Sequence, residues 1–130
     1  MDSNVELEIL LIDRFFLKQK AERYKTFVAK TDTRLKFIAV LAHLQDLDYS
    51  KFLKVEYDPE SHLLEIAKKH KLDVCYVISE NQNIDRQYID IQKAVKSVIG
   101  YGMGTFLIFG QAMAIYYEGE DMNDRWISKP

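Results

Sequence analysis

The stretch VIGYGMGTFLIFG, residues Val98–Gly110, decides how the C-terminal half of this 130-residue chain is interpreted. It holds four of the chain's five glycines, three of them in a G-x-G-x-G run just before an apolar segment. Phosphate-binding loops follow a strand and open a helix, because free N–H groups at the helix N-terminus hold the phosphate. Here a helical pattern precedes the glycines and a strand pattern follows them. This order predicts a helix stop and a tight turn instead of a nucleotide-binding loop.

The residues before this stretch predict a βαβ unit. Val74–Ser79, with the sequence VCYVIS, is continuous in β-branched and aromatic residues, which is typical of a strand buried on both faces. Asp85 can cap a following helix, whose apolar residues recur at helical spacing as far as Val98. Thr105–Phe109 is the next strand. Two strands joined by a helix in one sheet are expected to be parallel, with a right-handed crossover.

The residues after this stretch predict antiparallel strands. Gly110 and Gln111 fit a two-residue type II′ turn, which prefers glycine first, so Ala112–Tyr117 is expected to return beside the preceding strand. Arg125–Ser128 is expected to close the edge of the sheet. The predicted sheet is therefore mixed.

The N-terminal half predicts a helical hairpin. Apolar residues recur at helical spacing from Val5 to Ala29, and a second apolar set widens the stripe beyond what one partner helix requires. A second helix is predicted from Arg34 to Asp46. Asp58-Pro59-Glu60 predicts the start of a further helix that runs to about Lys71. Residues 49–57 fit a short strand and a short helix equally well.

Together these patterns predict one α+β domain over residues 1–130, with the helical hairpin packed on a small mixed sheet. With 48% hydrophobic and 29% charged residues, the composition is that of an ordinary globular protein. No apolar run approaches the ~20 residues of a membrane span, and the N-terminus lacks a basic signal region, so no membrane association and a cytoplasmic location are expected. Cys75, the single cysteine, is expected to be a buried, inert thiol. The histidine and cysteine spacings indicate no metal or cofactor.

A small-ligand or enzyme site is one hypothesis, at the carboxyl ends of the two predicted parallel strands. Open sheets bind ligands at this edge. The candidate residues are Ser79, Glu80, Asp85 and Gln111. In this arrangement Glu118 lies at the opposite end of the sheet from Glu80, so the two carboxylates cannot share a metal ion.

A nucleic-acid surface is a second hypothesis, because residues 14–36 carry eight basic and two acidic residues, a local charge of +6. The candidates in this helical region are Arg14, Lys18, Arg23, Lys25, Arg34 and Lys36.

A non-catalytic interaction or regulatory protein is the preferred hypothesis, since no catalytic motif accompanies the surplus apolar surface of the first helix. Tyr116, Tyr117 and Trp126 form a candidate aromatic interface, and the expected partner is a second copy of the chain or another protein.

Overall fold

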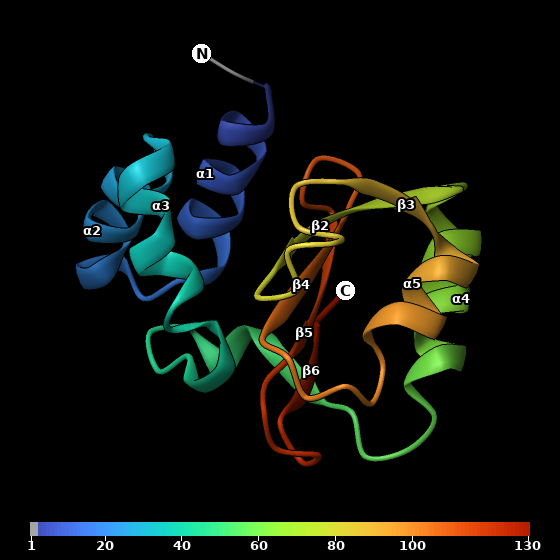
Figure 1. Cartoon of the computed structure of the whole chain (residues 1–130). Coiled ribbons are helices and arrows are strands. Elements are labelled where there is room, and N and C mark those ends of the chain that lie inside the picture. The colour runs from blue at the N-terminus through green and yellow to red at the C-terminus, as the bar shows by residue number, and fades with distance from the viewer. Residues whose placement is uncertain (1–2) are drawn as a thin grey trace.

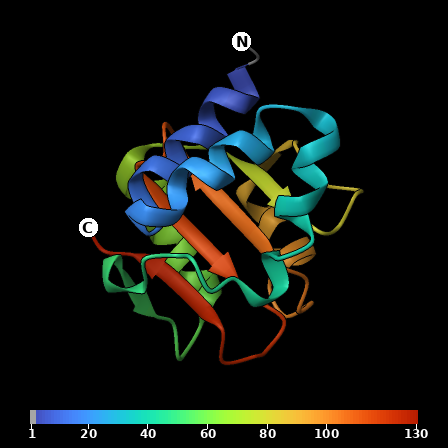
Figure 2. The same ribbon diagram turned by 90° about the vertical axis from the view of Figure 1, so that its left-hand side faces the viewer.

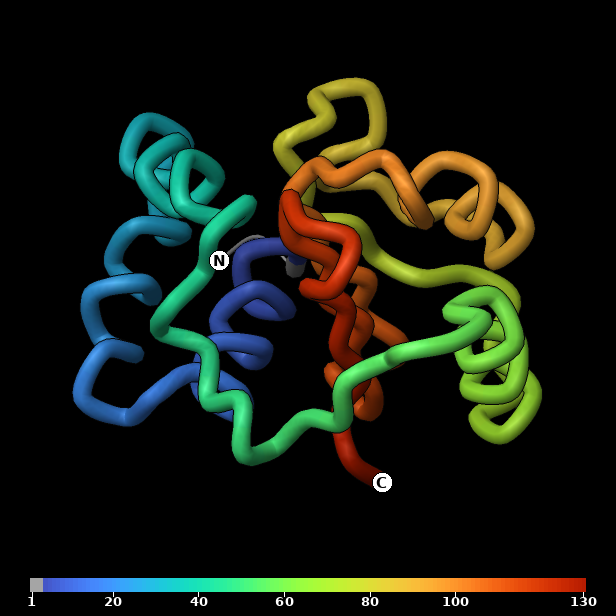
Figure 3. Tube along the Cα trace, turned by 90° about the horizontal axis from the view of Figure 1, so that it is seen from below, coloured from blue at the N-terminus to red at the C-terminus, as the bar shows by residue number. Residues whose placement is uncertain are grey.

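Residues 3–130, which the computed structural model describes, form one six-stranded sheet with helices on both faces (Figure 1). The helices α1 (Ser3–Phe15), α2 (Lys18–Val28) and α3 (Thr31–Ile38) cover the first face, and α4 (Pro59–His70) and α5 (Ile91–Val98) lie against the second (Figure 3). The α+β class is therefore confirmed. The strands are β1 (Phe52–Lys54), β2 (Val74–Ser79), β3 (Tyr88–Asp90), β4 (Thr105–Phe109), β5 (Ala114–Glu118) and β6 (Arg125–Ser128).

All pairings in this sheet are antiparallel, in the order β1-β6-β5-β4-β2-β3, so the predicted parallel βαβ unit is wrong. The cause is Tyr88–Asp90, which the sequence pattern assigned to the helix predicted between Asp85 and Val98. These residues form β3 beside β2, with Ile89 buried between two exposed neighbours. Because β3 reverses the chain before α5 begins, β4 reaches β2 from the opposite direction.

The cap of α5 differs from the prediction for the same reason. The helix begins at Ile91, and its N-cap is Asp90, whose carboxylate accepts a hydrogen bond from the Lys93 N–H at 2.8 Å. Asp85 lies in the β2–β3 connection and caps no helix. The predicted stop near Gly100 is confirmed, since α5 ends at Val98 and Gly100 has a φ of +87°.

The predicted helix over residues 5–29 is two helices, which break at Phe16 and Leu17. Neither glycine nor proline marks the break. Leu17 is extended, its N–H donates to Asp46 O, and Phe16 forms an isolated bridge with Leu47. The break lets Phe16 enter the core while α2 changes direction. The second predicted helix is also shorter, because α3 ends at Ile38 and only a 3-10 turn, η1 (Leu41–His43), follows.

The two faces of the sheet support two separate cores. Alternate residues such as Tyr76 and Phe106 face α1–α3, whereas Val77 and Leu107 face α4 and α5. Apolar side chains on both faces explain why β2 and β4 are almost uninterrupted in hydrophobic residues. Cys75 belongs to the second core, which confirms that the thiol is buried, and this burial raises its pKa to about 12.

The remaining predictions concern connections. Residues 49–57 contain both alternatives, since the 3-10 turn η2 (Tyr49–Lys51) leads directly into β1. The Asp58 cap of α4 is confirmed, because its carboxylate accepts from the Ser61 N–H at 3.2 Å. The β4–β5 turn is longer than two residues and spans residues 110–113. β6 lies inside the sheet, and the edge is formed by β1 (Figure 2).

Candidate functional site

A groove lies on the second face of the sheet, between α4 and the strands β6 and β1. The face beyond β5 carries no helix, so part of β6 and β1 remains open there beside α4. The groove has a volume of about 430 Å³, which falls within the range of ligand pockets. Its lining residues are Leu53, Lys54, Val55, His62, Glu65, Ile66, Lys69, His70, Met113, Ala114, Ile127, Ser128, Lys129 and Pro130.

The groove has an apolar floor. Ile127 and Ala114 come from the sheet and are largely buried, while Leu53 on β1 is 50% exposed. Met113, from the β4–β5 turn, is 54% exposed. Large apolar side chains with so much free surface at one site are typical of binding surfaces.

The rim of the groove is basic. Lys69 and Lys129 line it, and Glu65 is the one acidic side chain among the lining residues. His62 and His70 add donors or acceptors from α4. The charge therefore favours an anionic partner.

The open side of the groove is a sheet edge with free backbone groups. The Val55 N–H donates to Arg125 O and the Lys129 N–H donates to Lys51 O. Backbone groups alternate in direction along an antiparallel strand. The N–H and C=O of Leu53 therefore also point toward β6, whereas those of Lys54 point away from the sheet. Within residues 3–130, no strand pairs with this side of β1.

The four residues of the predicted ligand site do not meet. Gln111 lies at the far end of the sheet because β4 runs antiparallel to β2. Ser79, Glu80 and Asp85 do share one end, but their polar atoms are used internally. Ser79 Oγ contacts Thr105 Oγ1 at 2.7 Å, and Glu80 Oε1 accepts from the Gly104 N–H at 2.6 Å. The Ser79 hydroxyl and one oxygen of Glu80 are therefore engaged within the chain.

Asp85 instead belongs to a buried ion-pair network centred on Arg34. The guanidinium donates to both oxygens of Glu8 at 2.8 Å and to those of Asp85 at 2.6 and 2.9 Å. Tyr76 also donates to Glu8, and burial together with this carboxylate raises the pKa of the Tyr76 phenol. The network joins α1, α3 and the β2–β3 connection, so its role is structural.

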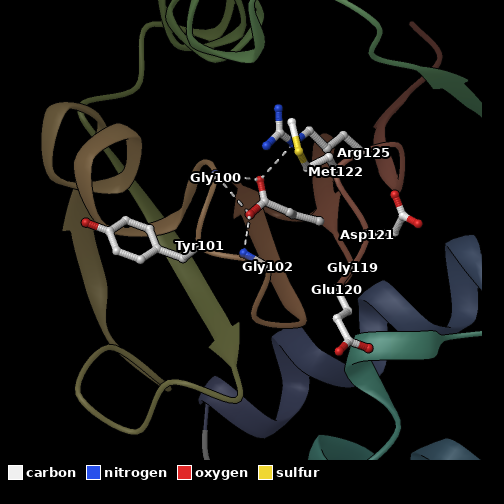
Figure 4. Close-up of a pocket in the computed structure, with 9 residues that line it drawn as sticks. Gly100, Tyr101, Gly102, Gly119, Glu120, Asp121, Met122 and Arg125 are labelled. Atoms are coloured by element: carbon white, nitrogen blue, oxygen red, sulfur yellow. Dashed lines mark hydrogen bonds and ion pairs between the residues drawn. The ribbon is translucent and has the colours of Figure 1, made fainter.

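The glycine loop does bind carboxylates, but they belong to the chain itself. The N–H groups of Gly100 and Gly102 donate to Glu118 at 3.1 and 3.3 Å (Figure 4). The Tyr116 hydroxyl donates to the same side chain at 2.8 Å. The buried Nε of Arg125 lies 3.4 Å from Glu118 Oε1 without forming a hydrogen bond. Glu118 thus occupies the position that an anionic ligand would need. The loop is a structural clamp.

Figure 4 also shows the small pocket beside this clamp, with a volume of about 160 Å³ and with Glu120 and Asp121 on its rim. The antiparallel sheet places Glu118 at the same end as Glu80, so the expectation that these carboxylates lie at opposite ends is wrong. Even so, no group of three or more metal-type side chains comes together within the described residues.

Three of the six residues predicted to bind nucleic acid are engaged within the chain. Arg34 is buried, Arg14 donates to Ala112 O at 2.9 Å, and Lys25 forms ion pairs with Asp13 and Glu22. The +6 charge in the sequence therefore overstates the free positive charge of this surface.

The other three, Lys18, Arg23 and Lys36, are exposed. Arg23 and Lys36 both lie over the ring of Phe27, at 5.4 and 5.7 Å from its centre. These contacts make a small basic surface on α2 and α3, on the side of the molecule away from the groove.

The predicted aromatic interface is mostly inside the protein. Tyr116 and Tyr117 are both fully buried, one in each core, and Trp126 is partly buried beside Tyr49. The surplus apolar residues of the first helix are buried as well, including Ile12 and Phe16. Ile9 and Leu10 are partly buried against the same core, so most of this apolar surface is used within the chain.

Comparisons with protein families, with curated proteins and with solved structures gave no match. No helix within residues 3–130 is long and apolar enough to cross a bilayer.

Sequence reasoning missed the groove. Its floor combines β1, which the sequence left undecided, with Ile127 of β6, which was expected at the edge. The available signal was the segment FLKV. In a strand, Leu53 and Val55 lie on one face and Phe52 and Lys54 on the other, so one face is apolar throughout.

Proposed function

We propose that this chain is a non-catalytic interaction protein that binds an extended segment of another polypeptide in the groove between α4 and the β6–β1 edge. The observation that carries the proposal is the combination of an apolar groove with an unpaired strand edge along its open side. Strand edges are a common means of peptide binding, because the backbone gives affinity and nearby pockets give specificity.

The other side-chain clusters described above favour a binding role over catalysis. The carboxylates and hydroxyls of Ser79, Asp85 and Glu118 are engaged by partners within the chain, which favours a structural role for them. The groove, in contrast, is lined by the exposed apolar side chains of Leu53 and Met113 and by the exposed Lys69 and Lys129.

A second copy of this chain is a less favourable partner than another protein. Lys54 on the edge strand would lie close to its own counterpart if two β1 strands paired about a two-fold axis. Lysines at edge strands are a known means of preventing such pairing.

The test is a selection from a library of random dodecapeptides displayed on phage, against the whole chain. The binding of enriched peptides is then measured by fluorescence anisotropy for the wild type and for Leu53→Glu. Leu35→Glu is the matched control, because Leu35 is 66% exposed on α3, on the opposite layer. We expect affinity to fall at least about tenfold for Leu53→Glu and to stay unchanged for Leu35→Glu. The proposal is wrong if no peptide is enriched, or if both variants bind alike.

A further inference from the structure

We infer that the segment bound in the groove is a strand of alternating apolar and acidic residues that pairs directly with β1. This inference rests on the proposed function and specifies its partner. It follows from three features of the edge: the direction of the free backbone groups, the two side-chain faces of β1, and the surrounding charge.

The backbone of β1 offers a short docking ladder of three groups. Lys54 directs both its N–H and its C=O outward, as derived above from the bonds that Lys51 and Val55 make to β6. Phe52 contributes its C=O, since its own N–H already donates to Tyr49 O. An incoming strand can therefore form hydrogen bonds around Lys54, at the usual spacing of about 4.8 Å from β1.

The two faces of β1 differ, which imposes an alternating pattern on the incoming strand. Leu53 points to the groove face, where Ile127 on β6 lies directly opposite it. Side chains of the partner on this face lie beside Leu53, where they extend the apolar floor outward, so they are apolar.

Lys54 projects on the opposite face, where its ammonium group lies 5.9 Å from the centre of the Trp126 ring. A partner side chain on this face lies beside that ammonium group. A carboxylate there pairs with Lys54 across the strands, whereas a basic residue would be repelled.

The charge around the groove extends the same preference. Lys69 and Lys129 outnumber Glu65 among the residues that line it. Acidic residues at the ends of the partner segment therefore meet lysines, and the central apolar residues meet the floor. A segment with this pattern carries its own charge and resists pairing with itself.

The test uses the selected peptides that lose affinity for Leu53→Glu, called groove-dependent peptides below. Their sequences are expected to show acids at every second position and to lose affinity at least about tenfold for Lys54→Glu. Lys36→Glu, on the exposed side of α3, is the control and is expected to leave affinity unchanged.

Single N-methylation along one such peptide tests the pairing itself. N-methyl groups are expected to abolish binding at the two alternate residues whose amides donate to the carbonyls of Phe52 and Lys54, and to be tolerated at the residue between them. Groove-dependent peptides that are basic, or that tolerate N-methylation throughout, would overturn this inference and leave the proposed function standing. A dimeric wild type that Leu53→Glu makes monomeric would also overturn it, since the partner would then be a second copy.

Discussion

Replacement of Arg34 by methionine should destabilise the protein severely, because it leaves two carboxylates without their shared cation. Glu8 is only 1% exposed, and it would lose the two hydrogen bonds from Arg34 while keeping the one from the Tyr76 hydroxyl. Removal of one partner from a buried ion pair costs about 3–5 kcal/mol. Since a domain of this size has a total stability of about 5–15 kcal/mol, Arg34→Met should remove a large part of it.

The double variant Glu8→Gln/Arg34→Met should recover much of that loss. A glutamine keeps an acceptor for Tyr76 and removes the buried charge, while Asp85 retains its bond from the Ser79 N–H at 2.9 Å. We expect the double variant to be at least about 2 kcal/mol more stable than Arg34→Met alone.

Urea unfolding followed by circular dichroism measures both effects, with Arg23→Met as the control for an exposed arginine on α2. A cost below about 1 kcal/mol for Arg34→Met would refute the reasoning. An additive double variant would do so as well, because it would mean that Glu8 and Arg34 are not coupled. Peptide binding in the groove should be unaffected by Arg34→Met in the folded protein, since the network lies on the other side of the sheet.

Three further predictions concern the two cores and the glycine loop. Burial raises the phenol pKa of five tyrosines, to about 12 for Tyr24; the others are Tyr49, Tyr76, Tyr116 and Tyr117. The folded state therefore keeps protons that the unfolded state releases above pH about 10. The contribution of these tyrosines to the free energy of unfolding should therefore be fully present below pH about 10. Above it, the free energy of unfolding should fall by up to about 1.4 kcal/mol per pH unit per tyrosine. In a pH titration, phenolate absorbance and the unfolded fraction should rise together. Gly104→Ala places a Cβ 2.3 Å from the Leu41 backbone and should cost about 3 kcal/mol, against about 1 kcal/mol for Gly100→Ala, where the nearest atom is 3.9 Å away; equal urea midpoints would contradict this. Leu63→Ala in α4 should cost about 2–5 kcal/mol, and the adjacent, more exposed Leu64→Ala clearly less, as measured by thermal unfolding.

Strong local patterns in the sequence were sufficient for several elements. The strands β2 and β4, the Asp58 cap of α4 and the helix stop before Gly100 all depend on residues close to one another in the chain. Their physical causes are β-branched runs, a side-chain cap and a positive φ, and each is readable from a few neighbouring residues.

The topology was not predictable in the same way, because one short strand reverses it. Tyr88–Asp90 has only three residues, and its apolar spacing also fits the helix that follows. Its pairing with β2 decides the direction of β4, and through β4 the place of Gln111 and Glu118. A local ambiguity over three residues therefore separates Gln111 from Ser79 and Glu80 and brings Glu118 to their end of the sheet.

The candidate sites depended on tertiary contacts that composition does not contain. The positive charge of Arg34 suggested a phosphate partner, yet two carboxylates from α1 and the β2–β3 connection neutralise it. The surplus apolar residues of the first helix suggested a dimer surface, yet the sheet and α2–α3 cover them. The groove arises where α4 ends its cover of the sheet, and this boundary is set by packing.

Residue-resolved amide hydrogen exchange at Lys54 tests the central claim most directly. In the free protein its N–H points away from the sheet, whereas the Leu53 N–H points toward β6. With a groove-dependent peptide at saturation, we expect exchange at Lys54 to slow at least about tenfold, while Leu53 changes little. Unchanged exchange at Lys54 in the saturated complex would contradict strand pairing at this edge.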